Sequence, residues 1–145
     1  MRVRLRLADS APLIWRTLDI DPSTPLDVMH LVLQRLFDWQ NVHLHQWRTL
    51  DPCSRAHDGV DLAWLPANLL DEMDGLPDTD ETIGDALALA DGTLHYEYDF
   101  GDSWHVAIER LDDESDDIKR SNDAGDGANV IEVALSHKKS NTSRR

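Results

Sequence analysis

The feature that most constrains the fold is an alternating segment in the second half of the chain, Tyr96-Glu97-Tyr98-Asp99-Phe100-Gly101-Asp102-Ser103-Trp104-His105. Aromatic and polar side chains alternate in it on both sides of a glycine. Successive side chains of a β-strand point to opposite faces, so this alternation is typical of a half-buried strand. Gly101 can supply the positive φ that a tight turn needs. The pattern therefore predicts a strong β-hairpin over about residues 93–110.

The hydrophobic pattern outside the hairpin predicts further strands and helices. Alternating side chains indicate strands over residues 2–7, 13–20 and 42–50. Apolar residues at helical spacing predict one main helix over about 25–37, with Thr24 as N-cap and Pro25 as its first residue. A short second helix is expected over about 82–89. These elements together predict an α+β fold.

The size and composition of the chain fit one folded domain. Its 145 residues, of which 41% are hydrophobic, can bury one core. No apolar run reaches the roughly 18 residues of a membrane-spanning helix, so we expect no membrane partner. The single cysteine, Cys53, excludes an internal disulfide and a cysteine-cluster zinc site. A cytoplasmic, reducing setting is the simplest interpretation.

The composition changes after Leu111. Residues 112–117 are a run of acidic residues and one serine, and the residues beyond them are mostly polar. We therefore expect a domain over 1–111, followed over 112–145 by an acidic linker and a polar basic tail that are largely disordered. Within this region, residues 130–135 could form a short strand or a helical turn.

The net charge of −14 is concentrated in the middle of the chain. Residues 51–117 carry twenty acidic residues and two arginines, whereas residues 1–50 and 118–145 are slightly basic. Non-specific affinity for DNA comes from Lys and Arg that neutralise phosphates, so this segment disfavours direct nucleic-acid binding. We expect protein partners. The plainer interpretation is that the acidic loops keep the protein in solution.

Four segments resemble the motifs of a known family: Pro12-Leu13-Ile14-Trp15-Arg16, Leu26-Asp27-Val28-Met29-His30, the block from Phe37 to Trp47, and the hairpin segment from Tyr96 to Trp104. In them the chain resembles the Ri-plasmid ORF-3-like proteins, which are also described as transposon resolvase-like passenger proteins of insertion elements. The resemblance implies an α+β fold with a twisted antiparallel sheet and an origin on mobile elements. It implies no established reaction.

The sequence departs from the family pattern in two places. Members usually carry a histidine two residues after the hairpin tryptophan, where this chain has Val106. His105 lies one residue earlier, so its side chain is expected on the opposite face of the strand, and we assign it no role. Nothing after Leu111 resembles the usual C-terminal segment. We expect a truncated, frameshifted or replaced end, and a poorly folding, degenerate gene product is one alternative.

The first candidate site is a metal or acid–base cluster of two histidines and two aspartates. His43 and His45 are two residues apart, so on a strand they would point to one face about 7 Å apart. Asp99 and Asp102 at the hairpin tip could complete a site for a divalent Zn, Mn or Fe ion. The alternative is that the histidines line the sheet while the aspartates bind backbone N–H groups of their own turn.

The second candidate is a binding surface of aromatic residues, Trp39, Trp47, Tyr98 and Trp104. Aromatic side chains are enriched at binding hot spots, but they also fill the cores of small domains. Trp39 follows the main helix directly and lies beside two polar residues. We therefore expect it to be partly exposed.

No catalytic residues can be assigned from the sequence. Cys53 and His57 are four residues apart in a loop, but nothing indicates the positioned base that a catalytic thiol needs. We therefore expect a non-enzymatic binding or accessory module that acts through protein contacts. The alternative is a metal-dependent enzyme or a resolvase-like DNA-processing factor that uses the His/Asp cluster.

Overall fold

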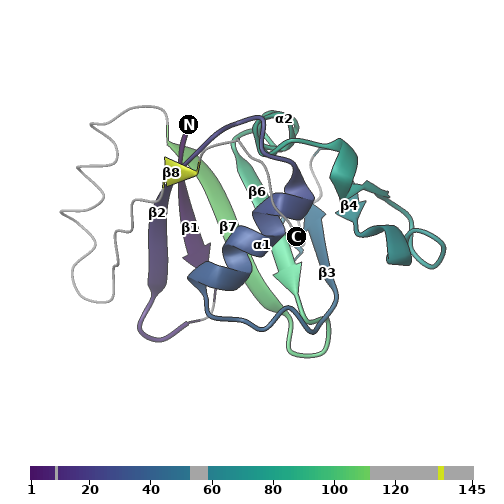
Figure 1. Cartoon of the computed structure of the whole chain (residues 1–145), viewed down its shortest axis with the longest axis horizontal. Helices are drawn as coiled ribbons and strands as arrows, with labels where there is room; N and C mark the ends of the chain where they lie inside the picture. Colours follow the sequence, from purple (N-terminus) through teal and green to yellow (C-terminus); the bar gives the residue numbers. More distant parts are fainter. Residues whose placement is uncertain (9, 53–58, 112–133, 136–145) are drawn as a thin grey trace.

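The computed structural model describes residues 1–8, 10–52, 59–111 and 134–135. Its sheet has the strand order β5-β4-β3-β6-β7-β1-β2-β8 (Figure 1). The strands are β1 (Arg2–Leu7), β2 (Ile14–Ile20), β3 (His45–Arg48), β4 (Ala63–Leu65), β5 (Leu76–Pro77), β6 (Thr93–Tyr98), β7 (Trp104–Leu111) and β8 (Ala134–Leu135). The predicted α+β class and hairpin are confirmed. The sheet is mixed, however, because β5 and β8 pair in parallel with their neighbours.

Two α-helices accompany the sheet, α1 (Leu26–Leu36) and α2 (Ile83–Leu89), together with the short 3-10 helices η1 (Ala67–Leu69) and η2 (Asp78–Asp80). Both predicted helices are confirmed. The N-cap of α1 is Pro25, not Thr24, and it has no side-chain cap. Instead, the starts of the two helices are joined by backbone hydrogen bonds. The carbonyl of Glu81 accepts from the first residue of α1, and the carbonyl of Thr24 accepts from the first residue of α2. Within the described residues, neither helix is long and apolar enough to cross a membrane.

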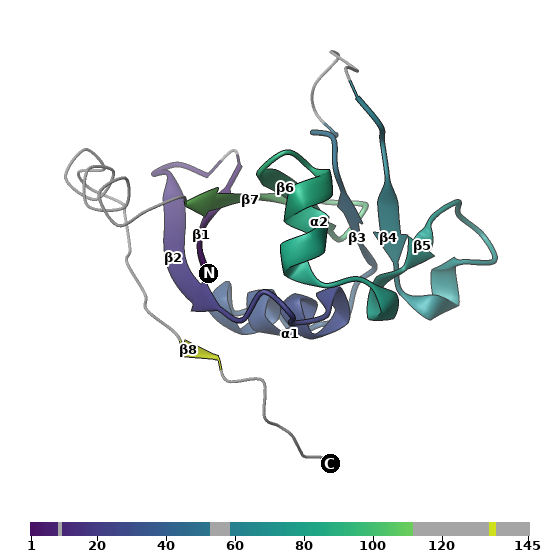
Figure 2. The same ribbon diagram turned by 90° about the horizontal axis from the view of Figure 1, so that it is seen from above.

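The core lies between the sheet and the helices. Figure 2 shows the sheet curving round one side of the molecule, with α1 crossing the open side. In the register of β6 and β7, Leu94 faces Ile108 and Tyr96 faces Val106. These side chains are fully buried and join apolar residues of α1 and α2 in one cluster. The side-chain alternation that the hairpin sequence predicts is therefore confirmed.

The hairpin turn differs from the prediction in its backbone. Gly101 does not have a positive φ, whereas Asp99 and Ser103 do, at 63° and 58°. The Asp99 carboxylate accepts hydrogen bonds from the backbone N–H groups of Gly101 (3.1 Å) and Asp102 (3.4 Å). Asp can occupy the left-handed region because its side chain bonds locally to the turn.

The third strand is shorter than predicted. It begins at His45, whereas residues 42–44 belong to the loop that follows α1. In this loop, the N–H of Val42 donates to the Tyr98 hydroxyl and the carbonyl of Leu44 accepts from the N–H of Asp99. These bonds with the hairpin replace a regular strand ladder. His43 therefore lies outside the strand that carries His45.

The predicted linker and tail over 112–145 lie outside the described residues, apart from β8. That two-residue strand falls within the segment 130–135 and pairs in parallel with the end of β2.

Candidate functional site

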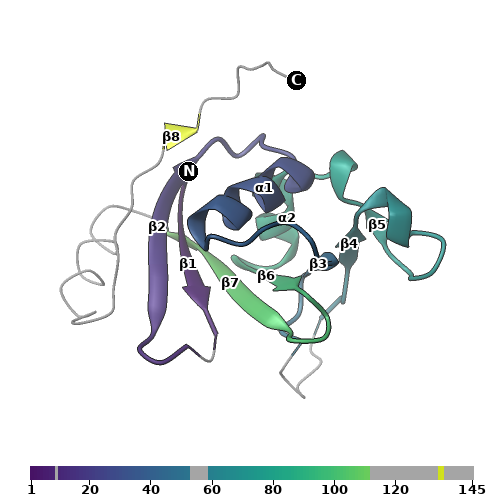
Figure 3. The ribbon, with the colours of Figure 1, turned by 60° about the horizontal axis from the view of Figure 1, so that its bottom comes forward.

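A pocket of about 270 Å³ lies between the α1–β3 loop and the tip of the β6–β7 hairpin. Figure 3 brings this end of the molecule forward, where the loop that leaves α1 runs past the hairpin. The residues that line the pocket are Asp38, Trp39, Gln40, Val42, His43, Tyr98, Asp99, Asp102 and Trp104. We call it the tip pocket. It brings together six of the residues that the sequence singled out: His43, Asp99 and Asp102 of the His/Asp cluster, and Trp39, Tyr98 and Trp104 of the aromatic set.

The C-terminus of α1 places the first wall of the tip pocket. Asp38 follows the helix with a φ of 56°, and its N–H donates to the carbonyl of Arg35. The N–H of Trp39 donates to the carbonyl of Gln34 at 2.8 Å. This pair of bonds forms a Schellman motif, in which a residue in the left-handed conformation ends the helix. The motif turns the chain so that Trp39 lies against the hairpin.

A buried polar network fixes the rest of the loop. Asn41 accepts a 2.7 Å hydrogen bond from His30 Nε2, and its backbone N–H donates to the Gln34 side chain at 2.8 Å. His30 Nδ1 lies 2.7 Å from the Tyr96 hydroxyl, and the oxygen of that hydroxyl accepts a hydrogen bond from the Gln34 side-chain amide. Because the Asn41 oxygen can only accept, His30 carries its proton on Nε2 and accepts from Tyr96 at Nδ1. Burial, together with the neighbouring His45, lowers the pKa of His30 to about 4, so the ring is neutral at pH 7.

Aromatic rings form the floor of the tip pocket. Trp39 stacks on Tyr98 with ring centroids 4.9 Å apart, and its centroid lies 6.1 Å from that of Trp104. His43 meets Tyr98 edge-on at 5.7 Å. Tyr98 is buried, Trp39 is partly exposed as expected, and Trp104 is 41% exposed. The pocket therefore presents two indole rings that are not completely covered by the protein.

The polar groups of the tip pocket are mainly acidic. Asp38, Asp99 and Asp102 line it, and the described residues of its lining include neither Lys nor Arg. His43 Nε2 lies 3.5 Å from Asp99 Oδ2, and His43 is charged only when it is protonated. Aromatic faces and carboxylates both attract positive charge. The arrangement can therefore hold a cation, whereas a phosphate or a carboxylate would be repelled.

Two predicted site residues lie elsewhere. His45 Nε2 is 3.2 Å from Asp78 Oδ2, and the His45 ring stacks on His30 with centroids 3.6 Å apart. His45 therefore belongs to the buried network under α1 and does not join His43 at the hairpin tip. Trp47 is fully buried, so it contributes to the core and not to a binding surface. The alternating pattern around Trp47 correctly predicts a strand, but it does not show which face of the sheet is covered.

A second, larger pocket of about 690 Å³ adjoins the tip pocket along α1. It is mostly apolar and shares Asp38 and Trp39 with the tip pocket, and its other lining residues are Val28, Leu31, Val32, Gln34, Arg35 and Leu36. Val28 and Leu31 are 42% and 51% exposed. We call this pocket the α1 groove. Sequence reasoning missed it, although Val28, Leu31 and Val32 already form a second apolar stripe at helical spacing.

Comparison with known proteins finds a matching family and a similar solved structure. A family model described as plasmid pRiA4b ORF-3-like protein matches residues 1–132. A crystal structure of a protein of unknown function from Methanosarcina mazei Go1 is similar, with a TM-score of 0.62 and 22% sequence identity. The similarity covers 76% of this chain and 58% of that protein, and at this identity it shows the fold alone. No curated protein sequence matches the chain.

Proposed function

The chain belongs to the plasmid pRiA4b ORF-3-like family, and we propose that it is a non-enzymatic binding module that holds a basic side chain of a protein partner in the tip pocket. One observation carries the proposal: the tip pocket joins partly exposed indole rings to three aspartates, with no Lys or Arg among the lining residues that the structure describes. In this role the protein would serve as an accessory factor of a plasmid or another mobile element.

The chemistry of the tip pocket favours a cation over other ligands. A guanidinium or ammonium group within about 6 Å of an indole face gains roughly 0.5–2 kcal/mol. Asp99 and Asp102 can add charge-assisted hydrogen bonds, which are stronger than neutral ones. The volume of about 270 Å³ lies below the roughly 300–1,000 Å³ of typical small-molecule sites. The pocket is therefore suited to one side chain and not to a whole cofactor.

The α1 groove indicates what surrounds the basic side chain. The groove and the tip pocket meet at Asp38 and Trp39, so one continuous segment of a partner could fill both. Val28 and Leu31 would then cover apolar residues of that segment, and their burial would add the hydrophobic part of the affinity. A protein segment in which an Arg or Lys follows apolar residues matches both the charge and the polarity of this surface.

The proposal can be tested with a charged probe and its neutral analogue. Acetyl-arginine amide and acetyl-citrulline amide have nearly the same shape, but only the first is a cation. In an NMR titration of the ¹⁵N-labelled protein, we expect the arginine derivative to shift the indole N–H signals of Trp39 and Trp104. The signals of Trp47 and Trp64 should not move, because both side chains are buried. Equal shifts with citrulline, or none with arginine, would contradict the proposal.

Substitutions can show whether arginine binding depends on the carboxylates of the tip pocket or only on the net charge of the protein. Asp102→Asn removes one carboxylate of the pocket, and Asp71→Asn removes an exposed carboxylate elsewhere. We expect only Asp102→Asn to weaken arginine binding, by about threefold to tenfold. Leu31→Gln tests the α1 groove: it should weaken a peptide with apolar residues beside its arginine and leave acetyl-arginine amide unaffected. Equal effects of the two Asn variants would show that binding follows net charge alone.

A further inference from the structure

Two histidines lie side by side on the face of the sheet opposite the tip pocket. In the register of the hairpin, His95 faces Ala107 and His105 faces Glu97, so the two rings are diagonal neighbours on one face. Tyr96, Tyr98 and Val106 point to the other face, toward α1. His95 Nδ1 lies 2.9 Å from His105 Nε2. The side chain of His105, to which the sequence led us to assign no role, is therefore paired across the strands.

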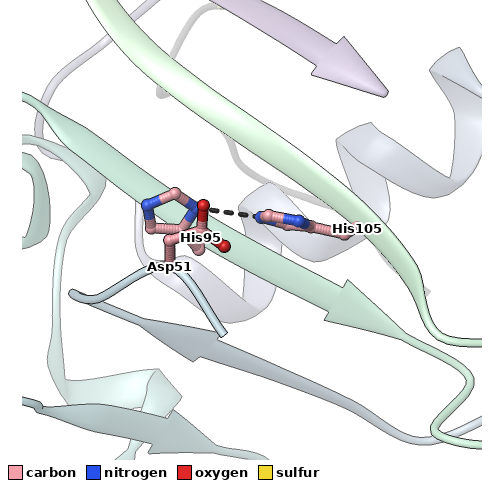
Figure 4. A group of neighbouring side chains, drawn as sticks. All are labelled: Asp51, His95 and His105. Carbon is pink, nitrogen blue, oxygen red and sulfur yellow. Dashed lines mark hydrogen bonds between the residues drawn. The ribbon is translucent and has the colours of Figure 1, made fainter. Parts of the chain in front are cut away.

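A carboxylate completes the group. Asp51 follows β3, in a segment held by Thr49, whose hydroxyl donates to the carbonyl of Val60 and accepts from the N–H of Leu62. Figure 4 shows the Asp51 carboxylate beside the two rings. One ligand atom from each of the three side chains lies within 4.8 Å of the other two. Within the described ranges, this is the one group of three or more His, Cys, Asp or Glu residues that meets this geometry.

We propose that Asp51, His95 and His105 form a binding site for a divalent transition-metal ion of the Zn²⁺ type. Imidazole nitrogens bind Zn²⁺ at roughly 2.0–2.1 Å and carboxylate oxygens at roughly 2.0–2.2 Å. Two nitrogens on one ion at those lengths, with angles of about 90–110°, lie about 3 Å apart. The 2.9 Å between His95 Nδ1 and His105 Nε2 already matches this spacing. For an ion to bind, the two rings must turn so that both nitrogen lone pairs point at it, and the Asp51 carboxylate must move closer.

The protonation of the histidines suits metal binding. At 2.9 Å one ring nitrogen donates its proton and the other accepts it, so the pair shares one N–H. Burial, with His105 and Arg6 nearby, lowers the pKa of His95 to about 4, although the Asp51 carboxylate acts in the opposite direction. The ring is therefore neutral at pH 7, as a metal ligand must be. On metal binding, the ring that carries the shared proton changes its tautomer, so that the proton ends on its other nitrogen and the ring stays neutral.

The ligand set also indicates which ion is favoured and what it would do. Two imidazoles and one carboxylate are borderline ligands that suit Zn²⁺, Co²⁺, Ni²⁺ or Fe²⁺ better than Ca²⁺ or Mg²⁺. Three protein ligands leave at least one position for water. The ion would tie the segment after β3 to the centre of the sheet. It would act independently of the tip pocket, from the other face.

The test uses the full chain, purified without a polyhistidine tag and treated with a chelator. Co²⁺ is titrated because its visible spectrum reports nitrogen and oxygen ligands, and Zn²⁺ then competes for the same site. We expect one ion per chain, a d–d band, and a rise in melting temperature on Zn²⁺ addition. His95→Asn and Asp51→Asn should weaken binding by more than about tenfold, since even outer-shell substitutions cost 10–100-fold.

Two controls decide whether the assignment holds. His43→Asn removes a histidine at the tip pocket and should leave binding unchanged. The double variant Cys53→Ser/His57→Asn removes two other ligand types that are near Asp51 in the sequence. It should also retain the site. The proposal would be overturned if the wild type bound no Co²⁺ or Zn²⁺, if His95→Asn bound as tightly as the wild type, or if binding disappeared in either control.

Discussion

The Tyr98 hydroxyl accepts a 3.0 Å hydrogen bond from the backbone N–H of Val42. A buried residue of the hairpin thus holds the loop that forms the opposite wall of the tip pocket. The aromatic hairpin therefore has two tasks, because its rings fill the core while its hydroxyl groups position the loop after α1. This link connects the stability of the fold to the geometry of the proposed binding site.

Replacing Tyr98 with Phe should separate these two tasks. The ring remains, but the N–H of Val42 loses its acceptor, which should lower the free energy of unfolding by about 1–2 kcal/mol. Urea unfolding measures this loss. The indole signals of Trp39 and Trp104 should shift in the NMR spectrum, while that of Trp47 should stay in place. An unchanged unfolding free energy would mean that the loop is held without this bond.

Trp47 and Trp104 should respond very differently to truncation, although the sequence gives them similar settings on strands. Trp47 is fully buried, so Trp47→Ala should cost roughly 3–5 kcal/mol or prevent folding. Trp104 is 41% exposed, so Trp104→Ala should cost less than about 1 kcal/mol. It should nevertheless weaken arginine binding at the tip pocket. Comparable losses of stability in thermal unfolding would contradict the assignment of Trp104 to a surface.

Asp99 allows the turn and the binding charge to be tested separately. Its φ of 63° and its bond to the N–H of Gly101 suit Asn as well as Asp. Asp99→Asn should therefore change the unfolding free energy by less than about 0.5 kcal/mol and still weaken cation binding. Asp99→Ala should cost about 1–2 kcal/mol, because it loses the turn bond and strains the backbone. If Asn and Ala destabilised the protein equally, the amide oxygen of Asn would not replace the carboxylate in the turn, which would contradict this prediction.

The stability of the folded protein should decrease as the pH falls, because His30 becomes protonated more readily in the unfolded chain. Its pKa is about 4 in the folded protein and 6.5 when unperturbed, so the unfolded chain binds a proton more readily. The contribution of the neutral ring is present above pH 6.5 and is lost as the pH falls toward 4. Between pH 7 and pH 5, His30 alone should cost about 2 kcal/mol. Urea unfolding at both values measures the change.

The matched variant for this prediction is His30→Gln, which cannot titrate. Other groups, including His95, titrate in both proteins, so the difference between the two pH dependences isolates His30. We expect a shallower dependence in the variant, whatever its stability at pH 7. Parallel curves would show that His30 is protonated without penalty in the folded state.

Much of the fold could be predicted because its signals are local. Alternation identified the β6–β7 hairpin, and helical spacing identified α1 and α2 to within a residue or two at their ends. The errors arose where another segment supplied the hydrogen bonds. Pro25 stands at the N-cap because the segment before α2 pairs with it. Residues 42–44 leave the strand because they bond to the hairpin tip.

The candidate sites were predictable only in part. The hairpin motif contained Tyr98, Asp99, Asp102 and Trp104, all of which line the tip pocket. His43 and His45 were expected to act together, yet they diverge because His43 precedes the strand. No sequence pattern marks His95 or Asp51, since neither belongs to a recognisable motif. The alternation of side chains along the hairpin could have placed His95 and His105 on one face, but it could not have placed Asp51 beside them.

The sequence by itself determined the α+β elements, the hairpin at Tyr96–Trp104 and the family resemblance, because periodicity and short motifs are properties of neighbouring residues. Only the tertiary structure decided which aromatic side chains are covered, which acids converge on the tip pocket, and that Asp51 lies beside His95 and His105. Burial and convergence depend on how distant segments pack, since a strand has two faces and its own pattern does not say what covers each one.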